Sequence, residues 1–442
     1  MPALAYIGTV EISQHDADCI YLSATCYKSA DYRPYLFVSR DSGASWSSIS
    51  DSFPQDEITR VIRADTVRQG LLFAGTETGV FVSADDGAGW TRMQGGFPVT
   101  PVYDMRVKHG DLIVATHGRS FWILDDLSPL RAAGSGLIPP RETVRQCLSW
   151  STGLFDGDGK DYSPAFGVEG ASYKVKNPDG RSQRRYLDVG ENPPDGAILF
   201  YWLDEIAEDN LLIEVHDSDG ALQAHFDVSD ERLKIDMKPT AHAGLNRFVW
   251  DLRSMPPVRL DRSLQDQPYQ PFARERDGPA GVRVVPGTYR VSLTAGGKTS
   301  THDLVVARDP RIDVSDADLA AQYKVAKALT DSVSDLYIGV NRIRMMRKQL
   351  TNLRLLVPSI DSQIEEAMTR LGEIEARLVD VHRETPRDVL RHPAGLDDTL
   401  MDLRWTALIA DAKPPLQVAE LTDIVTGDVQ SLLDELDTLV EG

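Results

Sequence analysis

The chain repeats one eight-residue stretch, Ser39-Arg40-Asp41-Ser42-Gly43-Ala44-Ser45-Trp46, as Ser83-Ala84-Asp85-Asp86-Gly87-Ala88-Gly89-Trp90. The aspartate and the tryptophan of the second copy both lie 44 positions after those of the first. A period of about 40–50 residues is typical of propellers and other arrays of similar units. An alternating apolar run precedes each copy, and Ser, Thr or Arg follows each tryptophan. The pattern therefore predicts a strand, a turn rich in Asp and Gly, and a second strand.

The residue types of this turn explain its local chemistry. An aspartate carboxylate accepts the N–H groups of a tight turn, glycine takes the positive φ that the turn requires, and the tryptophan ring packs beneath the hairpin. None of these tasks involves a substrate. We therefore predict structural roles for the turn residues Asp41, Gly43, Trp46, Asp85, Gly87 and Trp90.

The spacing S-x-D-x-G-x-x-W, present in both copies, resembles the Asp-box or BNR repeat of sialidase-like and sortilin-like β-propellers. A degenerate third copy ends at Asp125-Asp126, where the glycine and the following tryptophan are absent. The sequence from residue 112 to residue 131 is similar to the last blade of the bacterial BNR-repeat glycosyl hydrolases. The resemblance covers most of the chain, and it implies a β-propeller in a periplasmic or secreted protein.

The number of repeats is too small to close a propeller. Residues 1–131 hold about three units of four strands, whereas closed propellers typically have 4–8 blades. We therefore expect a partial β-propeller, the C-terminal portion of a larger assembly whose earlier blades lie upstream on the same polypeptide or on another one. Residues 141–145 form a short strand-like piece that we expect to return to the propeller, and we place the end of this domain at residue 148.

A stretch rich in Gly, Asp, Ser and Pro over residues 149–164 predicts a linker. Within it, residues 156–161 match the start of a calcium-binding loop. Such a loop needs an oxygen ligand at its fifth position and a bidentate glutamate at its twelfth, where this chain has Lys160 and Gly167. We therefore predict a solvated turn here and no metal site.

Residues 165–310 are predicted to be all-β. Strand-length runs rich in aromatic and β-branched residues lie at 198–203, 211–215 and 246–252. Residues 287–293 alternate cleanly and are predicted to turn at 295–298 into a partner strand at 304–306. The segment resembles the Ig-like domain of flagellar hook-capping proteins and of many secreted enzymes, which implies a β-sandwich. We expect it to brace the neighbouring domain.

The hydrophobic period changes at about residue 311, where a helical pattern begins. Ser315 and Asp318 approximate a capping box for a long amphipathic helix that stops before Pro358. Ser359 is predicted to cap a second helix that carries Val381 and ends near Pro386. A third helix precedes Pro414-Pro415, and a fourth follows them. The short links favour an antiparallel helical bundle over residues 311–442.

Composition excludes several classes of function. The 442 residues carry a net charge of −20 without basic blocks, which disfavours nucleic acid and anionic membrane surfaces as partners. No apolar stretch is long enough for membrane insertion. The start of the chain lacks the charged and apolar regions of a signal peptide, so taken alone it predicts a cytoplasmic location. Cys19, Cys26 and Cys147 lack the spacing of a zinc site, and we predict buried free thiols.

Candidate binding residues gather at one end of the predicted blades. The turn with the repeated aspartate joins the third and fourth strands, so the loops between the second and third strands emerge at the opposite end, near the axis where propellers bind ligands. The loops between successive blades lie at the same end and contain Asp56, Glu57 and Tyr103. The candidate ligand-binding residues are Arg33, Glu57, Glu77, His117 and Arg119. The alternative is that Glu77, His117 and Arg119 only pair across neighbouring blades and fix the loop ends.

Two functional classes remain open. The first is a binding protein that takes a glycan or a peptide at the axial mouth. The second is a sialidase-like or xyloglucanase-like glycoside hydrolase whose active site is completed by missing blades. Glycoside hydrolysis normally needs two carboxyl groups across the sugar, and Glu57 and Glu77 are the available carboxylates, without a complete catalytic set. The sequence contains no nucleotide, zinc-protease or serine-hydrolase motif and predicts no cofactor. We favour the binding class.

Overall fold

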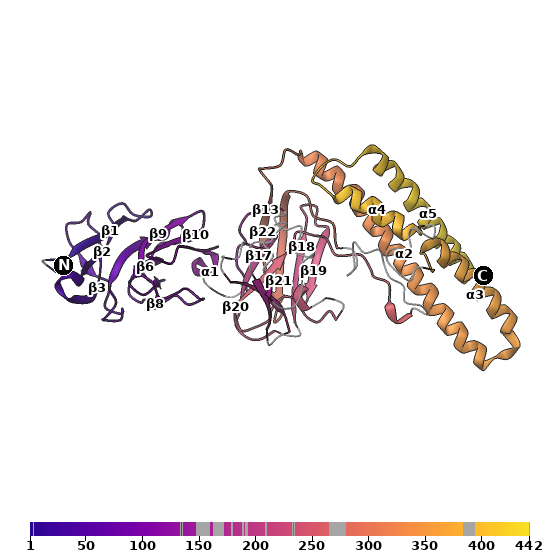
Figure 1. Ribbon diagram of the computed structural model, residues 1–442, viewed down its shortest axis with the longest axis horizontal. Helices are drawn as coiled ribbons and strands as arrows, with labels where there is room; N and C mark the ends of the chain where they lie inside the picture. Colours follow the sequence, from indigo (N-terminus) through magenta and orange to yellow (C-terminus); the bar gives the residue numbers. More distant parts are fainter. Residues whose placement is uncertain are drawn as a thin grey trace. The chain divides into compact units, whose positions relative to one another are not determined.

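The computed structural model describes five stretches of the chain (Figure 1). They are residues 1–146 apart from 3, 133 and 135, residues 160–161, residues 172–264 apart from 178, 179, 188, 189, 191, 192, 208, 209, 232 and 234, residues 280–382, and residues 394–441. The chain divides into two compact units. The first contains Met1–Arg141, Phe200–Ile206 and His242–Asn246, and the second contains Glu142–Leu199, Ala207–Ala241 and Arg247–Gly442.

The first unit begins with three consecutive antiparallel sheets, each built in chain order. The first sheet contains β1 (Tyr6–Ile12), β2 (Ile20–Cys26), β3 (Asp31–Ser39) and β4 (Ser47–Ser48). The second contains β5 (Thr59–Ala64), β6 (Leu72–Thr76), β7 (Val80–Ser83) and β8 (Thr91–Arg92). The third contains β9 (Val102–Lys108), β10 (Asp111–Thr116) and β11 (Phe121–Leu124). The two full copies of the repeat each belong to a four-stranded meander, as predicted, whereas the degenerate third unit has three strands among the described residues instead of the expected four.

Apolar side chains from alternate strand positions form the cores between these sheets. Tyr21, Leu36 and Val38 of the first sheet pack with Ile62, Ala74 and Phe81 of the second. The opposite face of the second sheet, with Val61, Phe73 and Val80, packs against Met105, Leu112 and Val114 of the third. The second sheet is thus covered on both faces, which explains the nearly continuous apolar sequence of β6 and β7.

Two glycines permit the close approach of neighbouring sheets. A Cβ atom at Gly8 would lie 2.1 Å from the carbonyl oxygen of Arg60, and one at Gly75 would lie 2.5 Å from a methyl group of Val102. Both distances are far inside van der Waals contact, so a larger residue at either position would force the sheets apart. The spacing of the stack therefore depends on these two positions.

After the third sheet the chain forms the short helix α1 (Ser128–Arg131) and the strand β12 (Gly136–Leu137), which pairs with β17 (Ala197–Leu203). The other strands of the chain are β13 (Thr143–Arg145), β14 (Lys160–Asp161), β15 (Ser172–Lys176), β16 (Ser182–Tyr186), β18 (Leu211–His216), β19 (Leu222–Asp227), β20 (Gly244–Trp250), β21 (Gly287–Ala295) and β22 (Lys298–Arg308). They form sheets in the orders β12-β17-β20, β14-β15-β16 and β13-β22-β21-β18-β19. The predicted hairpin at residues 287–306 is confirmed, with Ala295 opposite Lys298.

The strand predicted at residues 141–145 corrects one expectation. β13 pairs in parallel with β22, with Thr143 opposite Val306, instead of returning to the first three sheets. The side chain of Arg145 is buried, where its Nε donates to the carbonyl oxygen of Val284 at 2.8 Å and its Nη1 lies 2.5 Å from Asp411. These contacts hold the strand in the second unit. The predicted linker at 149–164 lies almost wholly outside the described residues, as does Cys147.

The helical region of the second unit contains α2 (Asp316–Leu356), α3 (Asp361–Leu378), α4 (Leu396–Leu408) and α5 (Leu416–Glu441). Figure 1 shows α2, α4 and α5 side by side, and these helices share a core with α3 that includes Leu336, Leu371, Leu400 and Leu432. The Oγ of Ser315 accepts the N–H of Asp318 at 3.1 Å, so the predicted cap is confirmed. None of the helices in the described part of the chain combines the length and apolar character that a membrane span requires.

The second helix departs from its prediction at both ends. Ser359 lies inside a 3₁₀ turn, Pro358–Ile360, and α3 begins after Ile360 without a side-chain cap. This turn leads directly into the helix and takes the place of the predicted cap. The helix ends at Leu378, because the next residue, Val379, takes an extended conformation. Val381 is therefore outside the helix, and Pro386 lies outside the described residues.

Candidate functional site

The repeated turns form as their residue types require. Asp41 accepts the N–H of Ser45 at 2.8 Å, and Asp85 accepts the N–H of Gly89 at the same distance. Gly43 and Gly87 have positive φ, at 91° and 89°. In the second turn Asp86 also accepts hydrogen bonds from Tyr21 and Arg40 of the first repeat. The second turn therefore joins the two repeats at the rim opposite the loops that follow β2, β6 and β10.

The two repeated tryptophans differ in burial. Trp90 is buried, its Nε1 donates to the carbonyl oxygen of Ile49 at 2.7 Å, and its ring lies 5.0 Å from Phe53. Trp46 is 39% exposed, and its Nε1 donates to Gly43 of its own turn at 3.1 Å. The expected burial beneath the hairpin holds for Trp90 alone. The difference arises because Ile49 and Phe53, which cover Trp90, come from the preceding sheet.

The acidity of the turn aspartates predicts a pH dependence. The pKa of Asp41 is lowered from 3.8 to about 2, first because the Ser45 hydroxyl donates to it, and that of Asp85 is lowered chiefly by the N–H of Gly89. A carboxyl group whose folded pKa is depressed stabilises the fold above its unfolded pKa and loses this contribution as pH falls through the folded pKa.

We expect the stability of the first unit to fall between about pH 4 and pH 2, and the double variant Asp41→Asn with Asp85→Asn to show a shallower fall. Urea unfolding at a series of pH values measures both. Asp56→Asn, at an exposed carboxylate outside the turns, serves as the control. An equal fall in stability with pH in the double variant and in the unaltered protein would contradict the attribution of this fall to Asp41 and Asp85.

Five residues from all three sheets meet at the end opposite these turns, and we call them the mouth cluster: Tyr27, Arg60, Glu77, Tyr103 and His117. The guanidinium of Arg60 lies 5.5 Å from the centre of the Tyr27 ring and 4.6 Å from that of Tyr103. It is ion-paired with Glu77. The Tyr103 ring lies 5.0 Å from that of His117. A cation is thus held between two tyrosines at the strand ends of consecutive sheets.

Local structure positions each member of this cluster. Tyr27 begins a 3₁₀ turn that follows β2, and Glu77 and His117 follow β6 and β10. Arg60 and Tyr103 each occupy the second position of the first strand in their sheets. In an antiparallel meander the start of the first strand and the end of the second lie at the same edge. The cluster therefore follows from the meander topology.

The structure brings together only some of the predicted residues. Glu77 and His117 belong to the mouth cluster, whereas Glu57 is buried and its Oε1 accepts from Thr78 and faces Arg92 at 3.5 Å. Arg33 lies in β3 and not in a loop, is ion-paired with Asp31 of the same strand at 2.7 Å, and together with Tyr35 lines a cavity of about 310 Å³. Arg119 is exposed, and within the described residues its guanidinium has no hydrogen bond or ion pair.

Sequence reasoning missed Arg60, which holds the cluster together. In the structure Arg60 occupies the second position of β5, as Tyr103 does in β9. A strand residue carries no sign in the sequence of which rings will lie beside it. The predicted pairing of Glu77 across blades is also different in the structure, since its partner Arg60 lies in the same sheet. The predicted free thiols of Cys19 and Cys26 are confirmed, and burial raises the pKa of Cys26.

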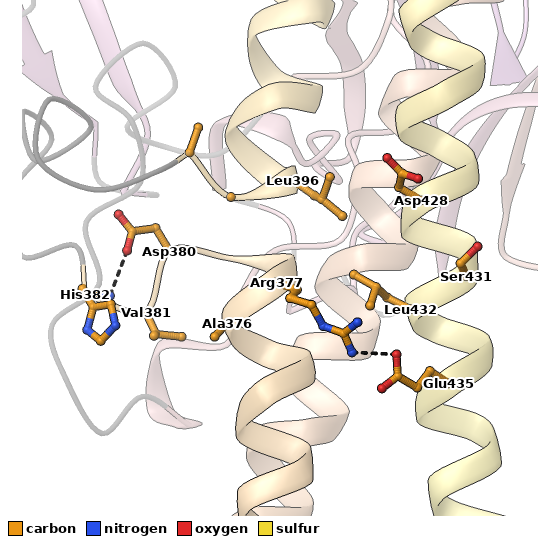
Figure 2. Close-up of a pocket in the computed structure, with 12 residues that line it drawn as sticks. Ala376, Arg377, Asp380, Val381, His382, Leu396, Asp428, Ser431, Leu432 and Glu435 are labelled. Atoms are coloured by element: carbon orange, nitrogen blue, oxygen red, sulfur yellow. Dashed lines mark hydrogen bonds and ion pairs between the residues drawn. The ribbon is translucent and has the colours of Figure 1, made fainter.

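A second cavity of about 570 Å³ lies in the helical region (Figure 2). Figure 2 shows Arg377 of α3 pointing toward Glu435 of α5, and the two form an ion pair at 2.6 Å. Asp380 accepts the N–H of His382 at 3.0 Å at its edge. Its lining includes His382 and Ala394, between which the chain lies outside the described residues, so no site is assigned to this cavity. Among the described residues, no group of three or more His, Cys, Asp or Glu side chains is arranged to hold a metal ion.

Comparison with known proteins shows no family. No family model matches the chain, and no curated protein matches it. Among solved structures, YCF48 bound to D1 peptide is 13% identical, with 56% of this chain and 80% of that one covered, at a TM-score of 0.21. The GH74 xyloglucanase from Xanthomonas campestris is 14% identical, with 68% and 47% covered, also at 0.21.

An ancestral GH74 enzyme is 12% identical, with 67% of this chain and 33% of that one covered, at a TM-score of 0.19. The chain thus spans about half of the xyloglucanase and a third of the ancestral enzyme. At such low TM-scores these likenesses carry no argument about fold or function.

Proposed function

We propose that the three sheets are part of an Asp-box β-propeller that binds a peptide or a glycan at the mouth cluster. The observation that carries this proposal is the Arg60 guanidinium held between Tyr27 and Tyr103. We further propose that the stack is completed by other sheets of the same repeat, on the same or another polypeptide. The proposed division is a partial propeller, predicted to residue 148 but without the strand β13, a linker over 149–164, an Ig-like sandwich over 165–310 and an antiparallel helical bundle over 311–442.

The chemistry of the mouth cluster suits both ligand classes. Tyr103 is 50% exposed, and an exposed aromatic ring offers a flat apolar surface to a sugar ring or a peptide side chain. Arg60 uses Nε and Nη2 to bind Glu77, and its Nη1 has no hydrogen-bond partner in the described residues. A guanidinium N–H can donate to a ligand carboxylate or hydroxyl. Aromatic contact and one directed donor are the usual elements of such a site.

Binding is tested on a glycan array and an immobilised peptide library, each probed with the full chain. We expect Arg60→Ala and Tyr103→Ala each to weaken binding to any retained probe by at least about tenfold, because each removes about 1.4 kcal/mol or more of contact. Arg40→Ala, which removes an ion pair at the opposite rim, is the matched control and is expected to leave binding unchanged. Equal affinities for all the variants would overturn the proposed site.

The runner-up function is glycoside hydrolysis, and the observation that favours it is a pair of carboxylates on one sheet. Glu77 is held by Arg60 and Glu57 by Thr78, the residue next to Glu77. An aryl-glycoside panel separates the two functions. Turnover that is abolished by Glu57→Gln and by Glu77→Gln would establish the hydrolase in place of the binding protein.

A further inference from the structure

The first sheet has one face that points away from the second sheet. The residues on this face occupy the same strand positions as the residues of the second sheet that the first sheet covers. In the first sheet Val10, Leu22 and Phe37 lie opposite one another on three neighbouring strands. In the second sheet Ile62, Ala74 and Phe81 form the equivalent row. Phe37 and Phe81 are also equivalent in the sequence repeat, because each lies four residues before the repeated aspartate. We call the first of these two faces the open face.

The two faces differ in what covers them. Ile62 is fully buried, whereas Val10, its equivalent, is 56% exposed. Ile12, which continues the row on β1, is 59% exposed. Leu22 and Phe37 are buried, with Ala5 and Tyr35 packed against them. An apolar face with this much exposure on its first strand marks an interaction surface.

Chain order shows what kind of element covers this face elsewhere. The equivalent face of the second sheet is covered by Tyr21, Leu36 and Val38 of the sheet before it. That of the third sheet is covered by Val61, Phe73 and Val80, again from the sheet before it. Both established interfaces are therefore made by a preceding sheet of the same repeat, and the open face continues this series.

The repeated tryptophans add a second requirement. Trp90 is covered by the segment after β4, which supplies the ring of Phe53 and the carbonyl oxygen of Ile49. Trp46 has neither contact and remains 39% exposed. The occupant must therefore carry an aromatic residue and an accessible carbonyl group after its fourth strand. The third sheet of a second copy lacks a fourth strand among the described residues, so it does not meet this requirement.

We propose that the open face binds a further four-stranded sheet of the same repeat, in which an aromatic residue after the fourth strand covers Trp46. This inference rests on the proposed completion of the stack by other sheets. It adds the face at which the stack is extended, the residues that make the contact, and the features of the sheet that fits. It does not depend on whether the mouth cluster binds a peptide or a glycan.

The experiment supplies the chain with a sheet that has these features. A second copy of residues 6–57 is inserted between Ala5 and Tyr6, so that the inserted sheet precedes the original one as the first sheet precedes the second. Val10→Cys is introduced in the original sheet, and its labelling by iodoacetamide is measured by peptide mass spectrometry. We expect labelling at least about tenfold slower than in the 442-residue chain, because the thiol becomes covered. Val67→Cys, at a site 66% exposed and away from the face, is expected to label equally in both chains.

Each other outcome overturns the proposal. Unchanged labelling of the Val10→Cys thiol while hydrogen exchange shows the inserted strands folded means that the face does not bind such a sheet. Inserted strands that stay unfolded lead to the same conclusion, because a fitting face would stabilise them. Slow labelling in the 442-residue chain that depends on its concentration would identify a second copy as the occupant. Ligand binding at the mouth cluster is measured separately on the glycan array and the peptide library. A failure of ligand binding is therefore distinguished from a failure of this interface.

Discussion

Replacing Trp90 by alanine is expected to cost the first unit about 3–5 kcal/mol, whereas the same change at Trp46 should cost less than about 1 kcal/mol. The two residues occupy the same position of the repeat, but only Trp90 is buried between two sheets. Its removal leaves a cavity against Phe53, whose ring also packs at 4.5 Å from Phe81. It also leaves the carbonyl oxygen of Ile49 without its donor. Trp46 loses only a partly exposed contact with its own turn.

Native-state hydrogen exchange of the β5 and β6 amides measures the free energy of opening of the first unit in the two variants, separately from that of the second unit. Trp90→Phe is the intermediate variant, since it keeps an aromatic ring and removes the indole donor. Equal losses at Trp46 and Trp90 would show that the tryptophans stabilise their own turns rather than the contact between sheets.

The second large effect is expected in the helical region, where Glu375→Ala should cost about 3–5 kcal/mol. The carboxylate of Glu375 is buried and accepts from Arg344 Nε at 2.6 Å and from Arg347 Nη1 at 2.9 Å. Arg344 is itself buried, and its Nη1 has no hydrogen-bond partner among the described residues. Without Glu375, the buried guanidinium of Arg344 loses its counter-charge, and the partly exposed Arg347 loses its ion pair. A buried charge without a partner is far more costly than a missing surface pair.

The matched control is Asp437→Ala. It removes the ion pair between Asp437 of α5 and Arg342 of α2, and both of these side chains are exposed. We expect a loss of at most about 1 kcal/mol there. Both variants are compared by hydrogen exchange of the α2 amides. The double variant Arg344→Met with Glu375→Leu should recover much of the loss, because it removes the unpaired charge together with its partner. Similar losses for Glu375→Ala and Asp437→Ala would contradict the argument.

Local patterns predicted the elements of this protein well. The strand-turn-strand repeat, the hairpin of β21 and β22 and the helix cap at Ser315 all formed as expected. Each depends on residues within one turn or one hairpin, where the conformational preference of the local chain decides. The cap at Ser359 failed because Pro358 starts a 3₁₀ turn that leads into α3 without a separate capping residue.

Contacts between distant segments were predicted less well. The sequence placed Arg33, Glu57, Glu77, His117 and Arg119 at one end of the blades, but only Glu77 and His117 joined a common cluster. Arg60 was missed because a strand residue gives no sign of which rings will lie beside it. The strand β13 was expected near the propeller, yet its pairing with β22 was decided by residues more than 150 positions away.

The sequence by itself determined that this protein is built from repeated meanders with an Asp- and Gly-rich turn, later strands and a C-terminal helical region, because hydrophobic period and turn chemistry act over a few residues. Only the tertiary structure decided that Trp90 is buried while Trp46 is exposed, that Arg60 lies between two tyrosines, and that one face of the first sheet is open. Identical residues in identical turns differ in these respects because burial depends on what packs against them, and that neighbour comes from another sheet.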